Sequence, residues 1–316
     1  MTILIPTYKR PHLLKNAVIS AMKQRSEIPY EIIVVDNNQS AEVLILLSSL
    51  HLKFPKTNLK LYQHSQNIGL YGNWNSCLQL GNSDWISILS DDDVLHSNWL
   101  EEMWKFKIKT KNALVLGCGV KLITKDNKEL KNENLLLRWY NRLYSQKTAI
   151  RKLSALDYFI GMPHLGCLGL LINRQAAQQA NGFISSFHPC SDFKMLADIV
   201  SNERTYITNK VLATYQTEGN TSSNPEIAYL GLSMNRKIQM GLIDKIPLRK
   251  KSILTAYIGF FCAKSVLGMR RHLQNYPPIT KYIKDNKVPI KFTSLRYFFL
   301  KLLLLFISKK ICNRSH

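Results

Sequence analysis

The chain is poor in acidic residues. Its 316 residues include 21 Asp and Glu against 43 Lys and Arg, which gives a formal net charge of +22. An excess of this size favours an anionic partner, such as a nucleic acid, an anionic lipid or a phosphorylated substrate, without choosing among them. Hydrophobic residues still make up 46% of the chain, so most of it is expected to be globular rather than disordered.

Cysteine is scarce, and no apolar run is long enough to cross a membrane. The six cysteines contain no CxxC pair and no metal-finger spacing, which favours free, mostly buried thiols in a reducing compartment. The apolar run at 297–307 contains Lys301 and is shorter than the about 20 residues that span a bilayer. No signal-peptide pattern precedes the apolar residues 3–6, so the chain is expected on the cytoplasmic side of a membrane.

Apolar runs and helical patterns alternate along the first 110 residues. The runs predict a buried strand at 3–6 and further strands at 31–35, 59–62 and 85–89. The helical patterns begin at Pro11 and continue at 41–50, 73–80 and 98–109. Strand–helix–strand units of this kind form parallel pairs with right-handed crossovers. The expected fold class is therefore α/β, with a mostly parallel, Rossmann-like sheet flanked by helices.

The pattern is weaker beyond residue 110. Residues 125–160 are polar, basic and aromatic in turn without a clear period, which predicts loops. Order returns with predicted strands at 168–172 and 211–215 and with predicted helices at 174–180 and 192–200.

Three consecutive carboxylates follow the strand at 85–89. Asp91, Asp92 and Asp93 repel one another, so a cation or strong hydrogen-bond donors must compensate them if they are buried. Mg²⁺ and Mn²⁺ prefer oxygen ligands and often take one or two carboxylates together with phosphate oxygens. The triplet therefore predicts either a divalent metal site that holds a pyrophosphate or a solvated acidic turn before the next helix.

Other candidate residues also follow predicted strands. Thr7 and Tyr8 come after the first strand and Asp36 comes after the second. Because ligands of open parallel sheets bind beyond the carboxyl ends of the strands, one crevice is expected to collect these side chains and the Asp triplet. Asp36 is a candidate for contacts with a ribose or a base, and an Asx turn is the alternative.

Asp192 opens an apolar helical pattern in the second half of the chain. A carboxylate there either stabilises the N-terminus of the helix or acts as a general base that removes a proton from a hydroxyl. The spacing alone leaves both roles open.

The positive charge is concentrated near the C-terminus. From Arg249 to His316, fifteen Lys or Arg stand against one acid, Asp285. Ser294, Lys301 and Ser308 recur every seven positions, which predicts a narrow polar stripe on a mostly apolar helix. Such a helix fits the surface of an anionic membrane, and a core or dimer helix is the alternative.

Four motifs, by their order and spacing, resemble the family 2 glycosyltransferases, inverting enzymes with the GT-A fold. Residues 3–10 (ILIPTYKR) resemble the first strand and nucleotide-contacting turn of that family, and residues 34–40 (VVDNNQS) resemble its second-strand motif. Asn67-Ile68-Gly69 followed by Asn73 is similar to the third signature, and residues 89–93 (LSDDD) are similar to the DxD-type metal motif.

The resemblance implies a donor site for a nucleotide-sugar, most commonly a UDP-sugar in this family, and a site for Mn²⁺ or Mg²⁺. Asp92 is expected to be the first metal ligand, supported by Asp91 and Asp93. The residues expected to contact the donor are Pro6, Thr7, Tyr8, Arg10, Asp36, Asn67, Gly69, Asn73, Asp91 and Asp92.

The resemblance also implies a catalytic base and a division of the chain. Residues 181–183 (NGF) followed by Ser191-Asp192 resemble the segment that ends in the base, so Asp192 is expected to deprotonate the acceptor hydroxyl. Residues 1–225 are expected to form the catalytic domain, with a nucleotide-sugar half at 1–110 and an acceptor half at 111–225. Residues 226–316 are expected to form a basic, helical, membrane-associating extension.

These features together imply a bacterial enzyme bound peripherally to the cytoplasmic face of the inner membrane. Its acceptor is expected to be a lipid-linked oligosaccharide of O-antigen or capsule assembly. An anionic membrane surface is expected as a partner, and nucleic acid is not.

Three rival functions each account for part of the sequence. A sugar-phosphate nucleotidyltransferase also needs a metal and an α/β sheet, but it normally has a Gly-rich basic loop after the first strand, and residues 6–10 contain no glycine. A nucleic-acid-binding protein would explain the charge, but the chain contains no recognised nucleic-acid motif. A non-catalytic membrane scaffold gives no account of four donor-site motifs in order.

Overall fold

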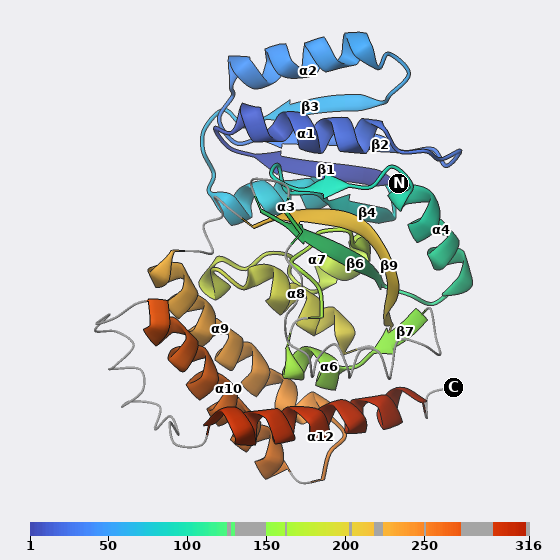
Figure 1. The fold of residues 1–316 in the computed structure, drawn as a ribbon. Coiled ribbons are helices and arrows are strands. Elements are labelled where there is room, and N and C mark those ends of the chain that lie inside the picture. Colours follow the sequence, from blue (N-terminus) through green and yellow to red (C-terminus); the bar gives the residue numbers. More distant parts are fainter. Residues whose placement is uncertain are drawn as a thin grey trace. The chain divides into compact units, whose positions relative to one another are not determined.

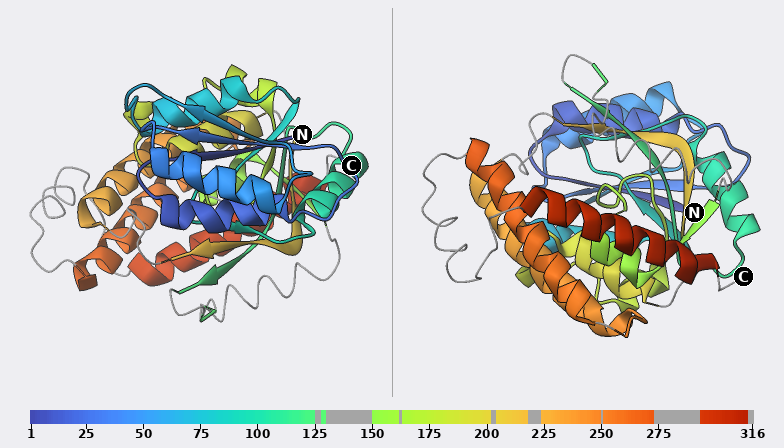
Figure 2. Two further views of the ribbon diagram at one scale, coloured as in Figure 1. Left: turned by 90° about the horizontal axis from the view of Figure 1, so that it is seen from above. Right: turned by 60° about the horizontal axis from the view of Figure 1, so that its bottom comes forward.

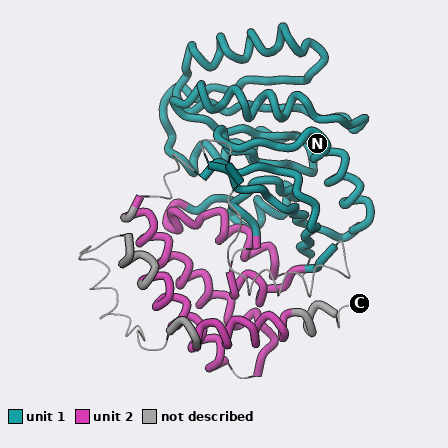
Figure 3. Tube along the Cα trace, in the orientation of Figure 1, with its two compact units in different colours: residues 1–152, 164–184, 204–218 teal, residues 153–163, 185–203, 219–316 magenta. Residues whose placement is uncertain are grey.

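A computed structural model of the chain describes residues 1–124, 128–129, 150–161, 163–201, 204–217, 224–249, 251–272 and 293–313. The chain divides into two compact units (Figure 3). Unit 1 comprises residues 1–152, 164–184 and 204–218, and unit 2 comprises residues 153–163, 185–203 and 219–316. The two units are defined by how the chain packs and not by what each part binds. The predicted functional division at residue 225 therefore stays a prediction.

Strands and helices alternate along the first part of unit 1 (Figure 1). In chain order they are β1 (Thr2–Thr7), α1 (Pro11–Met22), β2 (Glu31–Asp36), α2 (Ala41–Lys53), β3 (Leu59–Gln63), α3 (Leu70–Leu80), β4 (Trp85–Ile88), β5 (Val94–Leu95) and α4 (Trp99–Lys109). The later elements of the sheet and its helices are β6 (Val115–Ile123), β7 (Ile150–Leu153), β8 (Leu171–Asn173), α7 (Arg174–Gln179) and β9 (Thr205–Gln216).

The strands of the described residues form one nine-stranded sheet. Its order is β3-β2-β1-β4-β8-β6-β9-β5, and β7 lies beside β9. The run β3-β2-β1-β4 is parallel, as is the pair β6-β9, whereas β8 runs antiparallel to both of its neighbours and β5 runs antiparallel to β9. The predicted α/β class, with a mostly parallel sheet flanked by helices, is confirmed.

The strands at the centre are buried on both faces, as parallel strands covered by helices must be. Every residue of β1 and β2 is buried. Ile3 and Ile32 belong to the same core cluster as residues of α1 and α2, so those helices cover one face. Because side chains alternate along a strand, Leu4 and Ile33 face the other side, where α3 packs against β1 and β2.

The register of the parallel strands places three side chains at one edge of the sheet. Thr7 at the end of β1 pairs with Asp36 of β2, and Asp36 pairs with Gln63 of β3. The carboxyl ends of these neighbouring strands therefore meet where a crevice was predicted.

Unit 2 is helical. Its elements are α6 (Ala155–Ile160), the 3₁₀ turn η1 (Ser185–Phe187), α8 (Ser191–Val200), α9 (Pro225–Leu242), the 3₁₀ turn η3 (Ile243–Lys245), α10 (Lys251–His272) and α12 (Thr293–Asn313). Helices α10 and α12 lie side by side (Figure 2). Tyr257 of α10 stacks on Tyr297 of α12 with ring centroids 5.5 Å apart, and its hydroxyl donates to the carbonyl oxygen of Ile160 at 2.6 Å. The predicted helical C-terminal extension is confirmed.

The prediction of loops at 125–160 was wrong for its last part. Residues 150–153 form β7, and α6 follows it with a capping box in which Ser154 and Asp157 bond reciprocally. Residues 125–127 and 130–149 of that prediction lie outside the described residues, and Glu129 forms an isolated bridge with Ile123. Strand β6 was missed because Gly117 and Gly119 interrupt its apolar pattern at the point where its register with β9 shifts.

Of the predicted polar stripe on α12, Lys301 is half-buried and Ser308 is buried, and the side chain of Ser294 lies outside the described residues. Ser308 is buried together with Tyr297 and Leu304, whereas Phe299, Leu303 and Phe306 are exposed. The exposed residues follow an i, i+4, i+7 spacing and so share one face of the helix. Among the described residues, no helix has both the length and the apolarity needed to cross a bilayer.

Candidate active site

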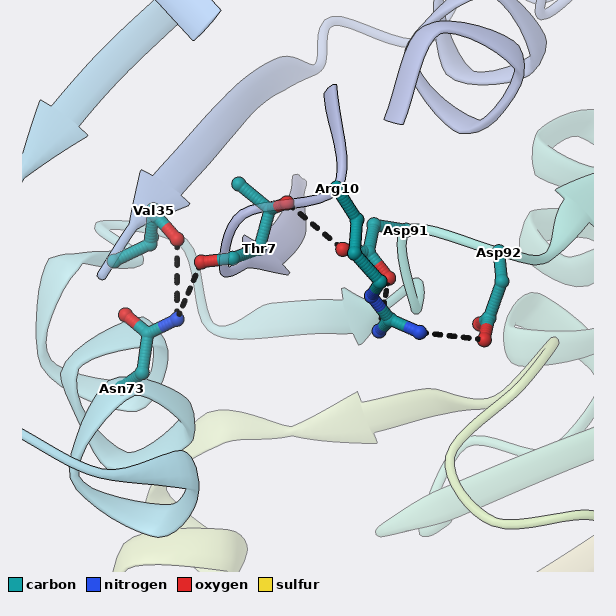
Figure 4. Close-up of polar contacts among 6 residues, drawn as sticks. All are labelled: Thr7, Arg10, Val35, Asn73, Asp91 and Asp92. Atoms are coloured by element: carbon teal, nitrogen blue, oxygen red, sulfur yellow. Dashed lines mark hydrogen bonds and ion pairs between the residues drawn. The ribbon is translucent and has the colours of Figure 1, made fainter. Parts of the chain in front are cut away.

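A hydrogen bond joins the end of β1 to the acidic loop after β4. The Thr7 hydroxyl donates to Oδ2 of Asp91 at 2.8 Å (Figure 4). Asp91 is almost completely buried, and this burial raises the pKa of its carboxyl to about 6, although the charge of Arg10 and the Thr7 hydrogen bond act in the opposite direction. The two strand ends are therefore tied together through a carboxylate.

The guanidinium of Arg10 contacts two carboxylates of the acidic loop. It forms an ion pair with Asp91 and a second one, of 3.2 Å, with Asp92 (Figure 4). Lys9, just before it, has a φ of 53°, in the left-handed region that non-glycine residues seldom adopt. The Arg10 side chain is 41% exposed, so solvent reaches one side of this cluster of one cation and two anions.

Asp93 points elsewhere. It is buried, and its Oδ1 accepts a hydrogen bond of 3.4 Å from the backbone N–H of Gln216 in β9. Burial, and then the charge of Asp92, raises the pKa of Asp93 to about 8. Within the described residues, no group of three or more His, Cys, Asp or Glu side chains is arranged to hold a metal ion.

Asp91 and Asp92 nevertheless fit a divalent cation. Their carboxylates converge on one positive group, the Arg10 guanidinium. Two carboxylates with the remaining positions taken by phosphate oxygens and water are a common oxygen-ligand set for Mg²⁺ or Mn²⁺. Of the three predicted metal ligands, the structure therefore brings two together and turns the third toward β9.

Asn73 of α3 connects the ends of β1 and β2. Its Nδ2 donates to the carbonyl oxygen of Val35 at 3.1 Å and to that of Thr7 at 3.4 Å (Figure 4). Its Oδ1 is buried and has no hydrogen-bond donor among the described residues. A buried acceptor without a partner is costly, which makes this atom a candidate contact for a ligand.

Asp36 is fully buried, and its carboxylate organises the turn into α2. Oδ1 accepts from the backbone N–H of Asn38 at 3.1 Å, and Oδ2 accepts from the N–H of Ser40 at 2.7 Å and from Nε2 of Gln63 at 3.0 Å. This pattern matches the Asx-turn alternative. The contact of Asp36 with a nucleoside stays a prediction.

Asn37, which the sequence did not single out, holds the predicted Asn67–Gly69 turn. Its Nδ2 donates to Oδ1 of Asn67 at 2.8 Å and to the carbonyl oxygen of Gly69 at 3.1 Å, and its Oδ1 accepts from the N–H of Ile68 at 3.0 Å. Gly69 has a φ of 80°, which a side chain would strain. A polar residue directly after a buried strand was the available signal for Asn37.

The other two predicted donor contacts flank this region differently. Pro6 is buried within β1 beside Val35. Tyr8 is partly exposed, with the ammonium of Lys9 at 5.2 Å from the centre of its ring. The Tyr8 side chain is therefore accessible to a ligand. The Pro6 side chain is not, so Pro6 affects the site only through the course of the β1 backbone.

Asp192 belongs to unit 2, where it lies in the first turn of α8. Its Oδ1 accepts a hydrogen bond of 2.7 Å from the N–H of Phe193. Burial raises the pKa of Asp192 to about 6. A carboxyl with this pKa is ionised near neutral pH and more basic than an ordinary aspartate, as a general base requires.

Comparison with known families decides the class of the protein. The family model of Glycosyl transferase family 2 matches residues 2–167, more than half of the chain. The chain belongs to glycosyl transferase family 2. Residues 2–167 therefore form a glycosyltransferase domain, which decides against the rival nucleotidyltransferase.

Family 2 membership agrees with a curated relative and with solved structures. The succinoglycan biosynthesis protein ExoM of Rhizobium meliloti (strain 1021) is 28% identical over 112 residues, which are 35% of this chain and 36% of that protein. The match therefore spans about a third of either protein.

Two solved structures share the fold of this family 2 chain. Residues 1–349 of S. aureus TarS in complex with UDP give a TM-score of 0.57 at 17% identity, covering 87% of this chain and 72% of that chain. The mannosyltransferase PcManGT from Pyrobaculum calidifontis, in complex with GDP-Man and Mn²⁺, gives 0.56 at 14% identity, covering 96% and 84%. At sequence identities this low, the similarity shows a shared fold and does not show a shared activity.

Proposed function

We propose that this family 2 glycosyltransferase transfers a sugar from a nucleoside-diphosphate sugar, UDP-linked as the first choice, to an acceptor hydroxyl with inversion at the anomeric carbon. The observation that carries the proposal is the Arg10 guanidinium in contact with both Asp91 and Asp92 at the carboxyl ends of parallel strands. This edge of an open α/β sheet is where such folds bind nucleotides.

The donor diphosphate would meet the groups of this cluster. Arg10 is partly exposed and offers a planar fork of N–H donors suited to phosphate oxygens. The unpartnered Oδ1 of Asn73 offers an acceptor for a hydroxyl or an N–H of the nucleoside. The complexes of TarS with UDP and with UDP-GlcNAc support a uridine nucleotide as the first candidate.

Asp91 and Asp92 would hold Mn²⁺ or Mg²⁺ beside the diphosphate, whereas the predicted third ligand Asp93 bonds to the backbone of β9 and would only help to shape the acidic loop. Such an ion stabilises the negative charge that develops on a departing diphosphate. The complex of PcManGT with Mn²⁺ supports this assignment. Thr7 would orient Asp91 through its 2.8 Å hydrogen bond, so that the carboxylate faces the same cation as Asp92.

Asp192 would act as the general base of a direct displacement. Its raised pKa makes it basic enough to take the proton of the acceptor hydroxyl, and its charge persists at neutral pH. The acceptor oxygen then attacks the anomeric carbon while the bond to the diphosphate breaks. One displacement of this kind inverts the configuration and needs no covalent enzyme intermediate.

The acceptor is proposed to be a lipid-linked saccharide of surface polysaccharide assembly, such as O-antigen, at the cytoplasmic face of a bacterial inner membrane. The short match to a succinoglycan biosynthesis protein supports a polysaccharide product. Helices α10 and α12 contain no acidic residue, and α12 exposes Phe299, Leu303 and Phe306 on one face. A basic pair of helices with an exposed apolar face suits an anionic bilayer surface.

Donor turnover tests this proposal. Purified protein is incubated with UDP-glucose, UDP-galactose, UDP-GlcNAc and GDP-mannose in turn, with Mn²⁺ or EDTA, and release of the nucleoside diphosphate is measured. We expect one donor to be consumed only with the metal, and Asp92→Asn to abolish the release. Lys105→Gln, which removes an exposed ion pair with Glu101 on α4, is the control and should turn over normally. Consumption of a donor at equal rates in EDTA would refute the metal assignment.

A further inference from the structure

A cavity of about 330 Å³ lies within unit 2, between α9, α10 and the segment that enters α8. Pro189, Ala228, Leu232 and Phe261 contribute apolar walls. Its volume is at the lower end of the range of small-molecule sites, which is about 300–1,000 Å³. The cavity is therefore large enough for part of a ligand.

Most polar groups of the lining are already bonded within the protein. The Cys190 thiol donates to the carbonyl oxygen of Gly231 at 3.6 Å, and the Ser265 hydroxyl donates to the carbonyl oxygen of Phe261 at 3.0 Å. Burial, and then the charge of Asp192, raises the pKa of Cys190 to about 12, so its thiol is neutral. Asn235 is the remaining polar side chain in this lining. The cavity thus presents hydrocarbon and one amide.

This lining suits a hydrocarbon ligand better than a sugar. A sugar ring has hydroxyl groups on nearly every carbon, and each one buried without a partner costs about 1–3 kcal/mol. One amide cannot satisfy several hydroxyls. An alkyl or isoprenoid chain, in contrast, gains about 25 cal/mol of transfer free energy for each Å² of apolar surface that it buries. The oxygen that links the chain to its head group can accept a hydrogen bond from the side-chain amide of Asn235.

The cavity is adjacent to the proposed base. Cys190 lines it, and Asp192 follows two residues later at the start of α8, so their Cα atoms are no more than about 7 Å apart. A molecule whose hydroxyl reaches Asp192 therefore has its neighbouring groups close to the cavity. Helix α10 provides Phe261 and Ser265 to the wall and also packs on α12, the helix with the exposed apolar face.

We propose that this cavity binds the first part of the hydrocarbon chain of a lipid-linked acceptor, next to its linkage with the saccharide. The inference rests on the proposed function, because it needs Asp192 as the base and a lipid-linked acceptor. It adds a binding site in unit 2 and a substrate class, an isoprenoid or alkyl chain, that the donor site does not define. An acceptor without its chain loses this contact and binds more weakly.

The test measures binding of the apolar fluorophore N-phenyl-1-naphthylamine to the full chain and its displacement by farnesyl monophosphate. Decanoate is used in parallel, so that an isoprenoid chain and an acyl chain are compared directly. Ala228→Phe places a ring in the cavity and is expected to weaken farnesyl monophosphate binding about tenfold or more. Met240→Phe, at an exposed position on the same helix, is the matched control and should bind like the wild type.

Two further variants keep the test decisive. Ser265→Leu fills the cavity from α10 and is expected to act like Ala228→Phe if the latter fails to fold. Phe299→Ser removes an apolar side chain from α12 and should leave binding unchanged. Unchanged binding in a folded cavity variant, or loss of binding only in Phe299→Ser, would overturn the inference. Binding of UDP and of GDP with Mn²⁺ is measured on the same samples, because the absence of both would refute the proposed donor site while the farnesyl monophosphate result still decides the lipid site.

Discussion

The hydroxyl of Thr7 and the carboxylate of Asp91 lie 2.8 Å apart although 84 residues separate them in the chain. Thr7 ends β1, and Asp91 belongs to the loop that follows β4, the parallel neighbour of β1. This hydrogen bond fixes which way the buried Asp91 carboxylate points, and Arg10 then reaches both Asp91 and Asp92. The acidic loop is therefore part of a connected cluster.

Thr7→Val tests whether this hydrogen bond orients the cluster. Valine keeps the shape of threonine but cannot donate, so the free energy of unfolding should fall by about 1–3 kcal/mol. Metal-dependent UDP binding should weaken as well, because Asp91 loses its fixed direction. Urea unfolding and calorimetry measure the two effects. Thr57→Val, which removes a hydrogen bond to the carbonyl oxygen of Phe54 in a turn, is the control and should leave UDP binding intact.

Asp192 should set the acid limb of the pH–rate profile. Its pKa is about 6, and a general base works only when it is ionised. Thus kcat/KM for transfer should rise about tenfold per pH unit below about 6 and level off above it. Asp192→Asn should abolish transfer and keep UDP binding. Asp198→Asn, on the same helix and paired with Lys194 and Lys245, should retain transfer. Full activity of Asp192→Asn would eliminate this role.

The same carboxyl should make the protein less stable as the pH rises. The folded pKa of Asp192, about 6, lies above its ordinary value of 3.8, so the folded state binds more protons between these values. The stabilisation is present below pH 4 and is lost as the pH rises through 6. Relative to Asp192→Asn, the wild type should lose about 2 kcal/mol of unfolding free energy between pH 4 and pH 7. Urea titrations at several pH values give this difference, and a flat difference would contradict the assigned pKa.

The outward face of α12 should bind anionic membranes. Replacing Phe299, Leu303 and Phe306 together by serine removes the exposed apolar groups but keeps the charge. Binding to phosphatidylglycerol vesicles should fall about tenfold or more, since each side chain loses part of its transfer free energy. The matched control replaces three exposed apolar residues of α2 by serine, namely Leu44, Ile45 and Leu52. If both triple variants lost vesicle binding equally, or if the α12 variant lost none, the assignment of this face to the membrane would be contradicted.

The sequence predicted the first half of the fold well because local patterns determine it. The strands β1, β2 and β4 are short, mostly apolar runs that are almost entirely buried, and helices with apolar faces separate them. The edge strand β3 instead alternates between half-buried and exposed residues. Strand β6 was missed because two glycines interrupt its apolar pattern. Strand β9 was predicted too short, because its first residues are mostly polar. Their pairing depends on long-range contacts that no window of sequence reveals.

The sequence indicated which residues belong to the candidate site, but not the directions in which their side chains point. The strand-end rule placed Thr7, Asp36 and the acidic triplet at one edge of the sheet, and the register confirms this for Thr7 and Asp36. Nothing in a run of three aspartates indicates that Asp93 turns toward Gln216 while Asp91 turns toward Thr7. Those directions come from partners distant in sequence, as does the role of Asn37.

Calorimetric titration of UDP, with Mn²⁺ and with EDTA, into the wild type and Asp92→Ala tests the central claim most directly. The account predicts that UDP binds the wild type only with the metal, and that Asp92→Ala loses this metal-dependent binding while its unfolding temperature without ligand stays close to that of the wild type. The same titration with GDP identifies the nucleotide if UDP does not bind. Binding of equal strength with and without metal, or in Asp92→Ala, would contradict a metal-assisted donor site at the acidic loop.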